Sequence, residues 1–186
     1  PAWNKDYRAC TLAMHPSDAD ALNLEDGQVV RVETDAGSEE IEAGRQQLCE
    51  GLNDPEVLTK CIPGCRKMTE TVPDTYDVEL ELKVAAVGGS FNGKVALSDK
   101  TPPTHCRITV SGEGTLGTGT GTAEFTIVET GPGTCRLDYA GEGEIGGLVA
   151  GVGQRILKSV AKHLTKQFFK DLRKHFDETR QDAGAT

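Results

Sequence analysis

The segment "GGLVAGVGQRILKSVAKHLTKQFFKDLRKHFDE", residues 146–178, decides the fold of this chain. Apolar residues recur in it at about every fourth position, which is typical of one face of an α-helix. These positions are Leu148, Val152, Ile156, Val160, Leu164, Phe168, Leu172 and Phe176. One helix is therefore predicted from Gly146 to about Glu178. So long an apolar face needs a large partner surface, which a small helix cannot supply.

The sequence before this helix supplies that surface as a β-sheet. Residues 66–144 contain successive runs with alternating polarity, and "TYDVELELKV" at 75–84 is the clearest. Its apolar positions Val78, Leu80, Leu82 and Val84 alternate with charged ones. Turns are expected at "VGG", "DKTPPT", "GTLGTG" and "GPG". The pattern predicts an antiparallel meander with one apolar face, which curves around the long helix and leaves an apolar pocket between them.

Two short helices are predicted just before the sheet, in "GRQQLCEGLNDPEVLTKC" at 44–61. Asp54 and Pro55 divide them, since Asp caps a helix and Pro suits its first position. Pro63 and Gly64 end the second helix between Cys61 and Cys65. These cysteines are either half of a metal site or small apolar residues in a rigid corner. No nearby His pair or Cys-x-x-Cys completes a metal site, so none is predicted.

Residues 15–44 carry a separate pattern. A short helix is expected at 18–23, followed by a β-hairpin whose strands are "VVRVET" and "SEEIEA" and whose turn is "DAG". The predicted division is an N-terminal extension at 1–43, a main domain at 44–180 and a disordered tail at 181–186.

Charge is distributed unevenly along the chain. The net charge of −9 argues against nucleic acid as a partner, because phosphate repels it. Lysines nevertheless recur every four residues in the last helix, at positions 158, 162, 166, 170 and 174. Such a stripe is either a solvated helix face or a contact with an anionic membrane surface. The predicted membrane-contact residues are Lys162, Lys166, Phe169, Lys170 and Lys174. No apolar run approaches the roughly 20 residues of a membrane span.

Several motifs resemble one family. "LNDPEVLTKCIPGC", "FNGKVALSDKTPP", "SGEG" and "GGLVAGVGQRILKSVAKHLTKQFF" occur in the order seen in the CoxG family of carbon monoxide dehydrogenase subunits, a START-like (SRPBCC) family. The resemblance covers residues 44–178 and implies an α+β helix-grip fold. Residues 14–43 are similar to a fragment of the molybdopterin-dinucleotide-binding barrel of molybdenum oxidoreductases. Such a fragment cannot close a barrel alone.

The resemblance implies a binding protein rather than an enzyme. Its ligand would be a quinone or another lipid-like molecule, held without a covalent bond. The protein would be cytoplasmic, and would link a carbon monoxide dehydrogenase-type molybdenum hydroxylase to the membrane. The expected pocket residues are Cys61, Val84, Val87, Phe91, Phe125, Leu148, Val152 and Ile156. Two alternatives stay open: a START-like cyclase, dehydratase or hydrolase, and a ligand-free assembly or recruitment factor. The sequence shows no Ser–His or Cys–His pairing, so no catalytic residue is predicted.

Overall fold

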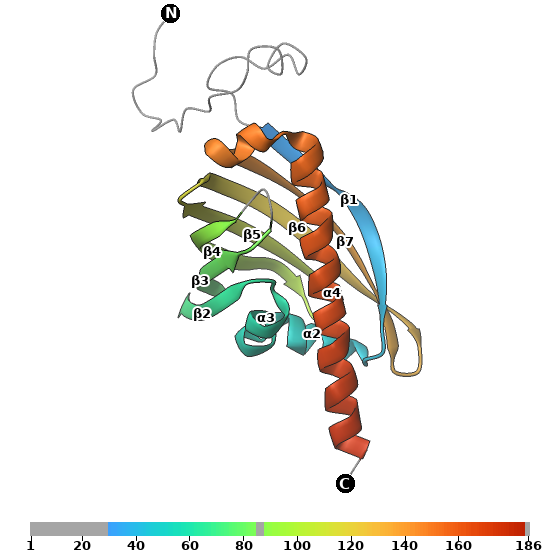
Figure 1. The fold of residues 1–186 in the computed structure, drawn as a ribbon. Coiled ribbons are helices and arrows are strands. Elements are labelled where there is room, and N and C mark those ends of the chain that lie inside the picture. Colours follow the sequence, from blue (N-terminus) through green and yellow to red (C-terminus); the bar gives the residue numbers. More distant parts are fainter. Residues whose placement is uncertain (1–29, 85–87, 185–186) are drawn as a thin grey trace, which may run out of the picture.

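The computed structural model describes residues 30–84 and 88–184, which form one seven-stranded antiparallel sheet with helices on one face (Figure 1). The strands are β1 (Val30–Ile41), β2 (Cys65–Val72), β3 (Thr75–Leu82), β4 (Gly89–Thr101), β5 (His105–Gly114), β6 (Gly117–Gly131) and β7 (Thr134–Gly146). The helices are α2 (Arg45–Asn53), α3 (Pro55–Cys61), the 3₁₀ turn η1 (Leu148–Val152) and α4 (Gln154–Gly184).

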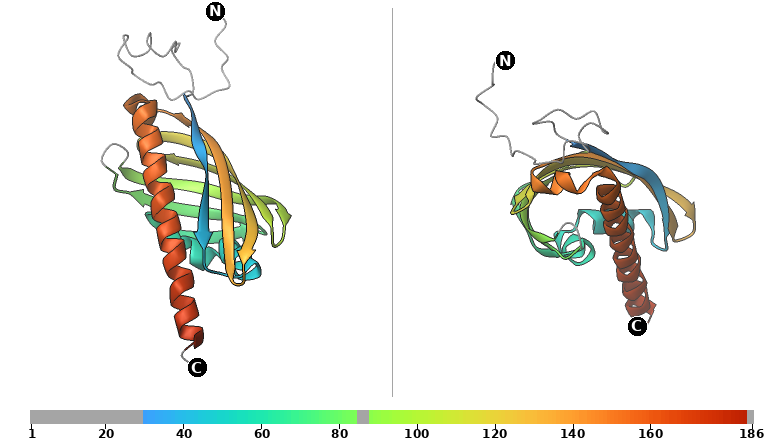
Figure 2. Two further views of the ribbon diagram at one scale, coloured as in Figure 1. Left: turned by 90° about the vertical axis from the view of Figure 1, so that its right-hand side faces the viewer. Right: turned by 45° about the horizontal axis from the view of Figure 1, so that its top comes forward.

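The sheet is a meander whose order is β1-β7-β6-β5-β4-β3-β2. It arches over the helices, as Figure 2 shows from the side and from above. The predicted curved antiparallel sheet with a long C-terminal helix is confirmed. Successive side chains of each strand point alternately to the helix side and to the outer face of the sheet, as the sequence predicts. Val78 is buried on the helix side, while its neighbour Asp77 lies on the outer face and pairs with Lys94 at 2.8 Å.

The two short helices also agree with the sequence. An Asp54 carboxylate oxygen accepts a hydrogen bond from the Glu56 backbone N–H at 2.8 Å, and Pro55 takes the first helical position. Gly64 follows α3 with φ of 77°, a conformation that glycine adopts without strain. The corner between α3 and β2 therefore depends on local chemistry, as predicted.

The predicted hairpin at 29–43 is wrong. Val30–Ile41 forms one strand that pairs with β7 along its length, with a register shift between Thr34 and Gly37. Two residues of β1 there lie opposite one residue of β7, so "DAG" forms a β-bulge instead of a turn. The long β7 edge explains the difference, because a continuous strand satisfies more of its backbone groups than a hairpin would. The predicted helix at 18–23 lies outside the described residues.

The C-terminal helix begins later than predicted. β7 continues to Gly146, η1 follows, and α4 begins only at Gln154. Gly147 and Gly153 have φ of 86° and 89°, so the backbone leaves the right-handed helix on both sides of η1. At the other end, α4 continues to Gly184, so most of the predicted disordered tail is helical. α4 packs mainly on β1 and α3 (Figure 2).

The core of the described residues falls into three apolar clusters. The largest joins α2, α3 and the C-terminal half of α4 to β1, β6 and β7. A second surrounds Leu157 near the start of α4. The third lies on β3, β4 and β5 around Tyr76, Val78 and Leu97. The apolar residues of the helix-side face therefore do not form one continuous core.

Candidate functional site

Glycines occupy the part of the sheet that lies between these clusters. Gly93, Gly112 and Gly119 pair across β4, β5 and β6, and Gly121 pairs with Gly143 across β6 and β7. Register and alternation place all five on the helix-side face. We call these five residues the glycine floor. No side chain rises from it, and a Cβ added at Gly119 would meet only one atom within 4 Å, the Glu144 carbonyl oxygen at 3.8 Å.

Apolar side chains border the glycine floor. Phe91 precedes Gly93 by two positions and Ile145 follows Gly143 by two, and both pack in the cluster around Leu157. Val110 pairs with Gly121 on the same face and remains 40% exposed. The floor is thus a partly exposed surface with apolar borders.

Two hollows are found among the described residues. One, of about 660 Å³, is lined mainly by polar side chains of the outer face, such as Asp77, Lys94, Ser111 and Thr120. Gly93, Gly112 and Gly119 of the glycine floor also line it. The other, of about 460 Å³, lies between α4 and β1. Apolar ligands favour apolar walls; these border the glycine floor, whereas the hollow on the outer face is lined mainly by polar side chains.

The structure separates the sequence-predicted pocket residues into groups. Phe91 and Val152 pack in the cluster beside the glycine floor, and Phe125 packs against the largest cluster. Val84 is partly buried just after β3. Val87 lies outside the described residues. These positions are compatible with a pocket, although the individual contacts with a ligand stay predictions.

Three of the predicted pocket residues do not pack beside the glycine floor, and their contacts with a ligand also stay predictions. Cys61 is 1% exposed and lies inside the largest cluster. Leu148 and Ile156 are 62% and 43% exposed. The break at Gly153 explains the exposure of Ile156, because it shifts the helix phase and turns Leu157 inward instead.

Sequence reasoning also missed the glycine floor itself. In "GEGTLGTGTGTAEF", residues 112–125, glycines recur at alternate positions. Period-two spacing puts them on one face of each strand. This alternate spacing of glycines is the sequence feature that predicts the glycine floor, because it indicates a strand face without side chains rather than a loop.

The predicted membrane contact needs one correction. Phe169 is 1% exposed and stacks on Tyr139 with ring centroids 4.7 Å apart, so it cannot reach a bilayer. Lys162 and Lys166 line the hollow between α4 and β1. Lys170 and Lys174 are exposed, and Lys174 pairs with Glu178 at 3.7 Å.

The lysines at positions 158, 162, 166, 170 and 174 do not lie along one straight line on α4. A step of four residues turns a helix by about 400°, so each lysine is rotated by about 40° from the last. Lys158, Lys162 and Lys166 consequently face the hollow beside β1, while Lys170 turns away from it. Within the described residues, no helix is long and apolar enough to cross a membrane.

The cysteine thiols of the described residues are unsuited to nucleophilic chemistry. Burial raises the pKa of the Cys61 thiol to about 11. Burial is also the main cause that raises the pKa of Cys49, Cys65, Cys106 and Cys135. A nucleophilic thiol needs a lowered pKa. No group of three His, Cys, Asp or Glu side chains able to hold a metal ion occurs in residues 30–84 and 88–184.

Acid–base groups are likewise missing from the described core, which contains no buried polar or charged residue. The carboxyl groups with a shifted pKa lie at the surface. Hydrogen bonds from Arg66 and Lys83 lower the pKa of Glu81, and those from Arg136 and Ser38 lower the pKa of Asp138. Both carboxylates are held ionised by partners, so neither has the raised pKa of a general acid.

A curved antiparallel sheet, a long C-terminal helix and an apolar face between them define a START-like helix-grip protein. Within that class the chain belongs to the CoxG family of carbon monoxide dehydrogenase subunits, whose model matches residues 37–176. The model of the molybdopterin dinucleotide-binding domain matches residues 1–52. This second match covers a short part of the chain and includes β1.

Solved structures agree with this assignment. A conserved protein from Geobacillus kaustophilus is 33% identical with a TM-score of 0.75, over 77% of this chain and 95% of that one. A START superfamily protein from Mycobacterium smegmatis is 16% identical with a TM-score of 0.63, over 79% and 99%. The ZhuI aromatase/cyclase from Streptomyces sp. R1128 is 12% identical with a TM-score of 0.63, over 84% and 99%. The last two show the fold alone. No curated protein matched the chain.

Proposed function

We propose that this protein binds a quinone on the apolar face of its sheet, without a covalent bond. The observation that carries the proposal is the glycine floor between separate apolar clusters. A flat ring can approach a backbone from which no Cβ projects, and apolar side chains at the border can cover its edges and tail. Burial of apolar surface would drive binding, by about 25 cal/mol for each Å² removed from water.

We further propose that the bound quinone is the electron acceptor of a molybdenum hydroxylase of the carbon monoxide dehydrogenase type, and that the protein meets the cytoplasmic membrane surface. Membership of the CoxG family supports the enzyme partner. The similarity of residues 1–52 to a molybdopterin-binding domain is consistent with it. Exposed Lys170 on α4 is available to an anionic surface.

The two alternatives receive less support from the described residues. A cyclase or hydrolase would need a positioned acid or base, and the described core has no buried Asp, Glu, His, Lys or Arg to supply one. A ligand-free assembly factor would be expected to fill its apolar face. Val110 remains 40% exposed on that face, which favours a ligand.

A single substitution can test the glycine floor. Gly119→Leu places a side chain over the floor without a close backbone contact, so it should block ligand while the fold is kept. Thr120→Leu is the matched control, because it puts the same side chain on the outer face of β6. Menaquinone affinity is measured by fluorescence quenching, and co-purified lipid by mass spectrometry of solvent extracts.

We expect Gly119→Leu to weaken menaquinone binding at least about tenfold, which corresponds to about 1.4 kcal/mol. Thr120→Leu should bind as the wild type does. Equal affinity of the two variants, or no menaquinone in either assay with wild-type protein, would show that the floor is not a quinone site.

A further inference from the structure

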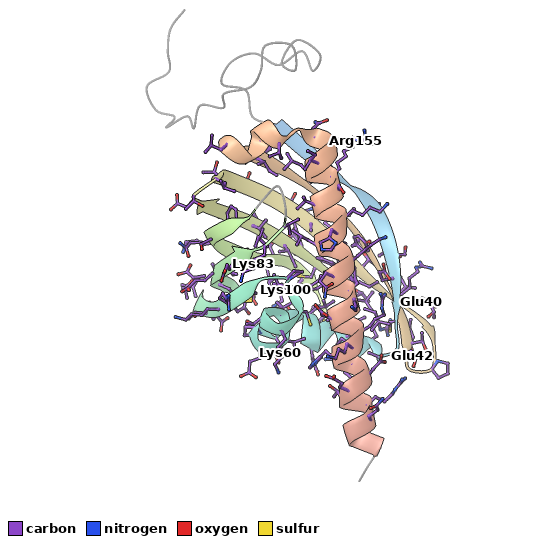
Figure 3. The ribbon with its side chains drawn as sticks, viewed as in Figure 1. Glu40, Glu42, Lys60, Lys83, Lys100 and Arg155 are labelled. Atoms are coloured by element: carbon purple, nitrogen blue, oxygen red, sulfur yellow. The ribbon has the colours of Figure 1, made fainter. Side chains whose placement is uncertain are left out.

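The hollow between α4 and β1 has an unusual concentration of positive charge. It measures about 460 Å³, and its α4 wall carries Arg155, Lys158, Lys162 and Lys166. Arg155 lies near the N-terminal end of α4 (Figure 3). We call this hollow the cationic groove. Its volume lies within the range of small-molecule sites.

The four cations of the cationic groove are not neutralised by the described residues. None of them makes an ion pair or hydrogen bond with another residue in that part of the chain. Elsewhere the basic side chains commonly have carboxylate partners, such as Arg107 with Glu124. Glu39, the acid that lines the groove, is itself paired with Arg173. The groove therefore keeps an excess of positive charge on a protein whose net charge is −9.

The opposite wall is built by the bulge in β1. The register shift between Thr34 and Gly37 brings Ala36 to the groove. Gly37 makes room for Tyr139, because a Cβ at that position would lie 2.4 Å from the tyrosine hydroxyl oxygen. The Tyr139 ring stacks on Phe169 and fixes the base of the groove. The groove therefore rests on packed core residues, unlike a row of lysines on a free helix.

The donors of the cationic groove suit a phosphate group. Three hydroxyl-bearing residues, Tyr139, Ser159 and Thr165, line it together with the four cations. Lysine ammonium groups bind phosphate as point charges, and hydroxyls add directional hydrogen bonds. Lys158 and Lys166 are eight residues apart, about 12 Å along the helix. This length exceeds one phosphate and fits a diphosphate or a phosphate ester with an organic part.

We propose that the cationic groove is a binding site for a phosphate-bearing ligand, separate from the glycine floor. The phosphate belongs either to a soluble phosphate ester or to the headgroup of an anionic lipid. Both sources present the same chemistry to the groove. The proposal does not depend on quinone binding.

The test compares two double variants of the full chain that carry the same net charge. Lys158→Gln with Lys162→Gln removes two groove cations. Lys60→Gln with Lys83→Gln removes two exposed cations outside it, one on α3 and one just after β3 (Figure 3). Sodium pyrophosphate is titrated by calorimetry at low ionic strength, where screening is weak. Phosphatidylglycerol and phosphatidylcholine vesicles are tested separately by co-sedimentation.

The groove variant should bind pyrophosphate at least about tenfold more weakly than wild type, because two charge-assisted hydrogen bonds are lost. The control variant should bind as wild type does. If only phosphatidylglycerol vesicles bind, and only the groove variant loses them, the site stands and its phosphate is a lipid headgroup. Equal losses in both variants, or no binding to either probe, would refute the site. Gly119→Leu should leave pyrophosphate binding unchanged, which separates this result from that of the quinone proposal.

Discussion

Replacing Phe169 with alanine distinguishes a core residue from a membrane anchor. The side chain is 1% exposed, stacks on Tyr139 at 4.7 Å and meets Phe168 edge-on at 5.1 Å. Truncating a buried Phe to Ala costs about 3–5 kcal/mol, through lost burial and the cavity that remains. A second aromatic partner places Phe169→Ala toward the upper part of that range. For a chain of this size the loss lowers Tm by about 6–20 °C.

Urea unfolding followed by circular dichroism measures this free energy, and Lys170→Ala on the next residue is the control. Lys170 is exposed, so its truncation should change stability by no more than about 0.5 kcal/mol. The reasoning fails if Phe169→Ala costs less than about 1 kcal/mol, the level expected away from a packed core. Loss of vesicle binding with unchanged stability would instead restore the membrane role.

Two further predictions concern the backbone and the thiols. Gly64→Ala should destabilise the fold by more than about 1 kcal/mol, since φ is 77° and the new Cβ would lie 2.4 Å from the Glu81 carbonyl oxygen. Gly131→Ala, whose new Cβ has no atom within 4 Å, should be nearly neutral in the same unfolding assay. Burial raises the pKa of Cys61 to about 11 in the folded state, so its contribution to stability is complete below about pH 9 and is lost as pH rises toward 11. Stability measured between pH 8 and 11 should fall less steeply in Cys61→Ala; an unchanged slope would show that this thiol is not the cause.

The sequence determined the elements whose signals are local. Asp54 and Pro55 specify a helix boundary through capping and a fixed φ, and both act within a few residues. Strand alternation in "TYDVELELKV" and the period of α4 required no knowledge of partners. The family motifs then led from these elements to the helix-grip class, which the structure confirms.

The sequence predictions that differ from the structure fall where contacts with distant parts of the chain, or a break in the helix, decide the local structure. "DAG" is compatible with a hairpin turn, yet the free edge of β7 draws residues 30–41 into one bulged strand. Gly153 resets the helix phase, so Leu157 is buried and Ile156 is exposed. Periodicity alone cannot find such a reset, because it assumes an unbroken helix.

Local chemistry in the sequence therefore determined which segments are helices and strands, where most of them end, and which superfamily they build. Only the tertiary structure decided that Phe169 is core, that five glycines meet in one floor, and that the bulge of β1 faces four cations without partners among the described residues. The physical reason is that capping and alternation act between near neighbours in the chain. Burial, strand register and charge pairing depend instead on surfaces contributed by residues far away in sequence.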